Sequence, residues 1–139
     1  MTPIPKLERL VRRLRGRRIA VVGNHASTMT LRRIVKHAEL VDSELPDEAF
    51  ALLRAGKVDA FALPREQLLD YSLTLPGSHV LADSYGINRV AIAIPKGQAG
   101  RLAFFSEFVE ETKASGLIGH IIERGALRGF EVAPPQHLK

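Results

Sequence analysis

The chain of 139 residues contains no cysteine and no apolar run that approaches the length of a membrane span. The lack of cysteine excludes disulfides, thiolate catalysis and cysteine-ligated zinc or iron–sulfur sites within this chain. A membrane-spanning helix needs roughly 18 consecutive apolar residues. The opening stretch, MTPIPKLERLVRRLRGRR, also lacks the apolar segment of a secretory signal. We therefore expect a cytoplasmic protein if residue 1 is the true start.

Recognisable catalytic motifs are also missing. The sequence has no Gly-x-Ser-x-Gly elbow, no phosphate-binding loop, no His-Glu-x-x-His motif and no paired-carboxylate constellation. The five histidines do not have the spacing of metal ligands. We therefore expect a protein that is not an enzyme and that holds no metal and no cofactor.

The net charge of +5 is concentrated at one end of the chain. Residues 1–18 hold seven basic groups against one acidic group, and the remaining 121 residues carry a net charge of −1. Leu7, Leu10 and Leu14 recur at helical spacing, which predicts a basic amphipathic helix within residues 1–17. We interpret its charges as the solvated face of a packing helix. The alternative is attraction to nucleic acid or anionic lipid, but no aromatic residues interleave the basic groups, which argues against nucleic acid.

The rest of the chain alternates between helical and strand patterns. Apolar spacing and turn residues predict helices over 5–15, 28–38, 46–55, 64–72, 98–114 and 117–124, and strands over 18–22, 39–41, 58–63, 79–82 and 89–95. The 18–22 run is apolar on both faces, as in a strand covered on both sides. This order predicts an α/β fold with a mainly parallel, three-layer αβα sheet.

Four stretches resemble the bacterial extracellular solute-binding proteins of the type II periplasmic-binding fold, in their polar amino-acid branch. These stretches are LRGRRIAVVGNHAST, EAFALLRAGKVDAFALPREQLL, YGINRVAIAIPKG and LAFFSEFVEETKASGLIGHIIER. The resemblance implies a solute-binding lobe over 18–84, a return strand and C-terminal helices over 85–130, and a flexible tail over 131–139. It corresponds to the second lobe plus the C-terminal part of the first, with most of the first lobe missing.

The resemblance further implies a periplasmic solute-binding component of an amino-acid-type ABC transporter, with a membrane permease as partner only within a transport system. In that family, a carboxylate at the end of the strand that matches 58–63 takes the ligand's ammonium group. Here that place reads Leu63-Pro64-Arg65, with no acid. We therefore expect a small anionic or polar solute as the ligand.

Candidate binding residues follow the predicted strands, because ligands of open α/β sheets sit beyond the carboxyl ends of the strands. Gly23 allows a tight turn, and the helix after it offers free N–H groups to an anion. The candidates are Asn24, His25, Ser27, Thr28, Arg65 and Tyr85. The simpler alternatives are a helix cap for Ser27 or Thr28, solvated side chains for His25 and Arg65, and plain packing for Tyr85. Asp59, inside an apolar strand, is expected to bond to a turn or to the backbone.

The C-terminal half predicts association between copies of the chain. A strand over 89–95 without neighbours leaves an open edge, and the helices over 98–124 carry more apolar residues than water tolerates. We expect a homo-oligomer, a dimer formed through residues 89–124. A second hypothesis for function is a cytoplasmic sensory or regulatory protein of the same fold, which acts through this interface or through the basic helix.

Overall fold

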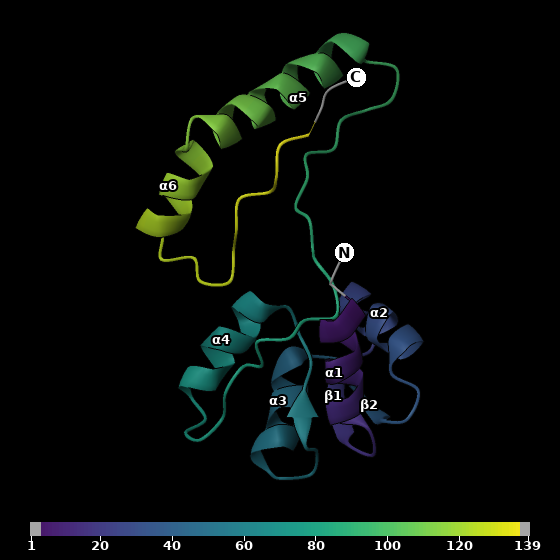
Figure 1. Cartoon of the computed structure of the whole chain (residues 1–139). Helices are drawn as coiled ribbons and strands as arrows, with labels where there is room; N and C mark the ends of the chain where they lie inside the picture. The colour runs from purple at the N-terminus through teal and green to yellow at the C-terminus, as the bar shows by residue number, and fades with distance from the viewer. Residues whose placement is uncertain (1–3, 137–139) are drawn as a thin grey trace. The chain divides into compact units, whose positions relative to one another are not determined.

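The computed structural model describes residues 4–136, and within them the chain divides into two compact units that meet between Asn88 and Arg89. The first unit holds all three strands (Figure 1). The elements of the described chain are α1 (Ile4–Leu14), β1 (Arg18–Val22), α2 (Ala26–Ile34), β2 (Glu39–Ser43), α3 (Pro46–Arg54), β3 (Ala60–Phe61), α4 (Arg65–Leu73), α5 (Ala99–Ala114) and α6 (Leu117–Arg124).

The three strands form a parallel sheet in the order β2-β1-β3. Ile19 of β1 lies opposite Leu40 on one side and Ala60 on the other. Parallel neighbours joined by helical crossovers are the expected outcome of alternating strands and helices. The prediction of an α/β fold with a parallel sheet is confirmed for the first unit.

Strand β1 is buried on both faces because its side chains alternate between two helical layers. Ile19 and Val21 pack into a core with residues from α1 and α2. Ala20 points the other way and packs with Ala49 of α3 and with Val58. The first unit is therefore a small αβα sandwich, and the prediction of a strand covered on both sides is confirmed. The buried residues of the first core are Leu10, Leu14, Ile19, Val21, Leu31 and Val35.

Helix α3 has clear start and stop signals. Pro46 occupies its first turn, and the Glu48 carboxylate accepts hydrogen bonds from the N–H groups of Leu45 and Glu44 at 3.3 and 3.2 Å. At the other end, Gly56 adopts φ +71° and donates to Leu53, while Lys57 donates to Leu52. This is a Schellman motif, which favours glycine because a side chain is strained at positive φ.

Helix α1 is a packing helix with a solvated basic face. It buries Leu10 and Leu14 in the core of the first unit and leaves Arg12 and Arg13 exposed. The prediction of a basic amphipathic helix that packs on the domain is confirmed, while the interpretation of its charges stays a prediction. Asp59 accepts a hydrogen bond from the Arg18 backbone N–H at 2.9 Å, as expected of a carboxylate with a backbone partner.

Two predicted strands do not form, which is a correction to the sequence prediction. In the part of the chain that the structure describes, residues 79–82 and 89–95 join no ladder. Leu81 instead packs its side chain against the core of the first unit, and Val90 is 91% exposed. An apolar run becomes a strand only when a neighbour pairs with its backbone groups, and neither run has such a neighbour within the described chain.

The second unit begins at Arg89 and contains α5 and α6, which contact one another. The last described residues run back beside α5 (Figure 1), where the Lys113 ammonium donates to the Pro134 carbonyl at 3.0 Å and the Gln136 N–H donates to Glu110 at 3.1 Å. Residues 137–139 of the expected flexible tail lie outside the described residues.

No helix in the described range combines the length and the apolarity needed to cross a membrane.

Candidate functional site

The corner between β1 and α2 holds four of the six candidate residues, and it is capped by the chain itself. Helix α2 begins at Ala26, one or two residues earlier than the expected cap, and His25 is the N-cap residue. The Nδ1 atom of His25 accepts from the Ser27 N–H at 3.3 Å and lies 2.7 Å from the Ser27 hydroxyl. The prediction that Ser27 or Thr28 caps this helix is wrong, because His25 already occupies the capping position.

The His25 cap removes most of the N–H groups that were expected to face a ligand. The Thr28 N–H donates to the His25 carbonyl at 3.0 Å, the His25 N–H donates to the Val22 carbonyl at 3.2 Å, and the Ser27 N–H is bound to the His25 ring. Three of the first donors of α2 are therefore already satisfied. The corner therefore has fewer free N–H donors for an anion than the sequence predicts. Asn24 is exposed beside it.

The interior of this corner is occupied by Tyr85. Its ring packs against the core of the first unit, and burial raises the pKa of Tyr85, an effect partly offset by the neighbouring Ser27 side chain. The Tyr85 hydroxyl and the Thr28 hydroxyl are both buried, and neither meets hydrogen-bond geometry with a partner in the described chain. Thr28 is only 1% exposed. Tyr85 therefore packs against the core beside Ser27, at the corner where the sequence predicts a solute.

Side-chain contacts of Arg65 and Asp83 hold the segment that carries Tyr85 in place. The Arg65 guanidinium donates to the Ala82 carbonyl at 3.2 Å. The Asp83 carboxylate, only 5% exposed, accepts from Arg9 at 2.9 Å and lies 3.9 Å from Arg13. Charged side chains thus connect the segment that carries Tyr85 to α1 and α4. Arg65, predicted as a ligand-binding residue, here binds the backbone of that segment.

Replacing Asp83 with alanine is expected to lower the free energy of unfolding by about 1 kcal/mol. Hydrogen bonds to charged groups contribute roughly 1.5–3 kcal/mol, but both arginines are about half exposed and water screens the pair. Urea unfolding followed by tyrosine fluorescence measures the change. Glu44→Ala, at an exposed position on the same unit, is the control. A loss no larger than that of the control would show that the Asp83 contacts do not hold the segment.

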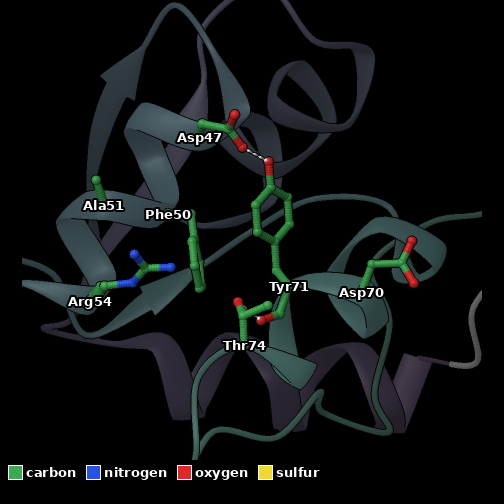
Figure 2. A pocket seen from close by; sticks show the side chains of 7 residues that line it. All are labelled: Asp47, Phe50, Ala51, Arg54, Asp70, Tyr71 and Thr74. Atoms are coloured by element: carbon green, nitrogen blue, oxygen red, sulfur yellow. Dashed lines mark hydrogen bonds between the residues drawn. The ribbon is translucent and has the colours of Figure 1, made fainter.

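A different hollow lies between α3 and α4, with a volume of about 400 Å³. Figure 2 shows its side chains, with Asp47 at one end, Thr74 at the other and the Phe50 and Tyr71 rings between them. The lining residues are Asp47, Phe50, Ala51, Arg54, Asp70, Tyr71 and Thr74. Five of these seven residues are exposed, so the hollow is a shallow groove open to solvent.

Two aromatic rings, Phe50 and Tyr71, line this hollow, and the Phe61 ring packs against both of them. The centroids of Phe50 and Tyr71 lie 4.7 Å apart, and Phe61 of β3 meets the Tyr71 ring edge-on at 5.5 Å. The Arg54 guanidinium carbon lies 4.8 Å from the centroid of Phe50, which is cation–π geometry. The wall is therefore apolar and fixed by ring packing, while a cation stands at its edge.

The Tyr71 hydroxyl is held by a carboxylate. It donates to the Asp47 Oδ1 atom at 2.5 Å. That hydrogen bond, with partial burial and the negative charge of Asp47, raises the pKa of Tyr71 to about 12. Tyr71 therefore stays neutral at physiological pH and orients Asp47 at the end of the hollow.

None of these lining residues was predicted as a binding residue from the sequence. Asp47, Ala51 and Arg54 lie at i, i+4 and i+7 on one face of α3. Asp70 and Tyr71 are adjacent near the end of α4, and Thr74 is its C-cap residue. The approach of α4 to this face of α3 depends on tertiary contacts, which the spacing of residues along the chain does not show.

Comparison of the chain with protein-family models and with curated proteins finds no match to either. The resemblance to solute-binding proteins therefore remains a prediction from the quoted stretches. What the structure establishes is an α/β unit with a three-stranded parallel sheet, a self-capped β1–α2 corner and an aromatic hollow between α3 and α4.

Proposed function

We propose that the first unit is a solute-binding module, and that its ligand is a small organic solute that carries an ammonium group on an apolar body. The observation that carries this proposal is the α3–α4 hollow, where carboxylates and one guanidinium surround a wall of aromatic rings. Sites for small molecules combine an apolar lining with a few polar groups that fix orientation. The hollow has both components.

The charges of the hollow favour a positively charged group on the ligand. Asp47 and Asp70 contribute two carboxylates against the single guanidinium of Arg54. An ammonium group gains from a nearby carboxylate and from the face of an aromatic ring. A carboxylate on the same ligand can pair with Arg54, so zwitterions fit as well. A ligand with only negative groups meets the Asp47 carboxylate and is disfavoured.

The parallel order β2-β1-β3 and the αβα layering support the proposal that this unit is related to the second lobe of type II periplasmic-binding folds. The support extends to the fold and not to the family's usual site, since Tyr85 and His25 close the β1–α2 corner. We therefore assign the ligand to the α3–α4 hollow in place of the corner predicted from the sequence.

A thermal-shift screen tests the proposal with four probe groups: aromatic amines, zwitterionic amino acids, benzoate and inorganic anions. A ligand at ten times its dissociation constant stabilises by about 1.4 kcal/mol, which corresponds to roughly 3 °C or more in Tm. We expect shifts of this size with amine-bearing probes and none with benzoate or inorganic anions. Stabilisation by anions alone, or by no probe, would contradict the proposal.

Matched variants locate the binding. Asp70→Asn removes one carboxylate from the hollow, and Glu44→Gln makes the same charge change at an exposed position outside it. One partly exposed charge pair is worth up to about 1 kcal/mol. The affinity for the best amine probe is therefore expected to fall about fivefold in Asp70→Asn and to stay unchanged in Glu44→Gln. Equal effects of the two variants would point to a site elsewhere.

A further inference from the structure

The second unit lacks a core of its own. From Arg89 to Gln136, no described residue is buried, although the unit carries many large apolar side chains. Those exposed by 40–91% are Val90, Ile92, Leu102, Phe104, Phe108, Leu117, Ile121, Leu127, Phe130 and Val132. The three phenylalanines among them can each bury 150–250 Å² of surface. Each partner in a stable protein interface buries about 800 Å².

Helix α5 has one broad apolar face, and only part of it is covered within the unit. Phe105 and Val109 lie one turn apart and are half-buried, and the Phe105 ring meets the Phe104 ring edge-on at 5.4 Å. Phe104 and Phe108 also lie one turn apart, but they are 64% and 47% exposed. A broad apolar stripe on a helix is normally covered over its whole width.

The exposed face of α5 has a self-complementary pattern. Arg101, Phe104, Phe108 and Glu111 follow one another at i, i+3, i+7 and i+10 along one face, and all four are exposed. If two such helices pack antiparallel about a two-fold axis midway between the phenylalanines, Phe104 of each copy meets Phe108 of the other. The same axis places each Arg101 against Glu111 of the second copy. A two-fold interface requires this kind of self-complementarity.

We propose that a second copy of this chain covers the face of α5 formed by Arg101, Phe104, Phe108 and Glu111, in an antiparallel two-fold dimer. The proposal does not depend on the solute site, which lies on the first unit. Among the described residues of the first unit, the large apolar side chains that are exposed (Met29, Leu45, Leu73 and Ile87) are scattered over different segments. The apolar surface best suited to cover this face is therefore the same face of another copy.

Light scattering coupled to size-exclusion chromatography tests the dimer on the full chain across micromolar concentrations. The unmodified protein is expected at twice the mass of one chain. The double variant Phe104→Asp/Phe108→Asp is expected to be monomeric, with a dissociation constant raised at least a hundredfold, because central aromatic residues dominate interface energies. Met29→Asp, which adds an acid at an exposed apolar residue of the first unit, is expected to stay dimeric. A monomeric unmodified protein, or a dimeric double variant, overturns the proposal.

A charge swap tests the identity of the partner. Arg101→Glu and Glu111→Arg each place like charges across the axis, and each is expected to weaken the dimer severalfold. The combined variant Arg101→Glu/Glu111→Arg restores opposite charges only if the two residues meet across copies, so its dissociation constant is expected to return close to that of the unmodified protein. Additive weakening in the combined variant overturns the antiparallel arrangement.

Discussion

Replacing Leu31 with alanine is expected to lower the free energy of unfolding of the first unit by about 2–5 kcal/mol. Leu31 of α2 is fully buried against β1 and α1, in the core that also contains Ile19 and Leu10. Its truncation loses apolar burial and leaves a cavity. Domains of this size are stable by about 5–15 kcal/mol, so the loss is a large part of the total.

Urea unfolding followed by tyrosine fluorescence is suited to this measurement. The chain contains two tyrosines and no tryptophan, and Tyr71 and Tyr85 both belong to the first unit. The signal therefore reports on that unit without contribution from α5 and α6. Met29→Ala, on the same helix but 60% exposed, is expected to change stability by less than about 0.5 kcal/mol. A Leu31→Ala effect as small as the Met29→Ala effect would contradict the packing of α2 on the sheet.

The folded protein is expected to contain no tyrosine that ionises at the ordinary pKa of 10.0. The hydrogen bond to Asp47 raises the pKa of Tyr71 to about 12, and burial raises the pKa of Tyr85. Alkaline titration of phenolate absorbance in the native protein is expected to show both transitions above pH 10. In concentrated urea both are expected near 10, since the Asp47 contact and the burial are lost.

A single substitution separates the two tyrosines. Asp47→Asn removes the negative charge and leaves only a neutral amide oxygen as acceptor, so the pKa of Tyr71 is expected to fall toward 10.0 while that of Tyr85 stays raised. Glu44→Gln is the matched control and is expected to leave both transitions in place. Native tyrosines that titrate together near 10, with helical circular dichroism intact, would contradict the assigned Tyr71–Asp47 contact.

The raised pKa of Tyr71 also links stability to pH. Folding favours the neutral phenol, so the contribution is fully present below pH 10, the unfolded value, and is lost as pH rises from 10 to about 12. A shift of two pKa units corresponds to about 2.7 kcal/mol. Tyr71 remains partly exposed, so solvent screening reduces the expected loss to about 1 kcal/mol.

Helices were more predictable from the sequence than strands because their signals are local. Pro46 and Gly56 mark the ends of α3, and Gly116 separates α5 from α6 within one residue of the predicted bounds. The prediction of a strand over 89–95 was wrong because a strand needs a pairing partner elsewhere in the chain. An apolar run alone does not show whether such a partner exists. The long 58–63 prediction shrinks to Ala60–Phe61 for the same reason, since only these residues complete a ladder with β1.

The candidate site was only partly predictable. The sequence placed His25, Ser27 and Thr28 at the end of β1 correctly, since the carboxyl end of a central strand is fixed by the topology. It did not reveal that Tyr85, far along the chain, closes this corner, or that Tyr71 and Phe50 stack between two helices. Both arrangements depend on tertiary contacts that have no signature in local spacing.

The central claim is tested most directly by a titration of the isotope-labelled full chain with the best amine probe. The amide chemical shifts that change on binding locate the site. A site between α3 and α4 predicts the largest, saturable shifts at Asp47, Ala51, Arg54 and Tyr71, with the amides of residues 24–28 unmoved. The largest shifts at 24–28, or no saturable shifts with any amine probe, would contradict a solute site in the α3–α4 hollow.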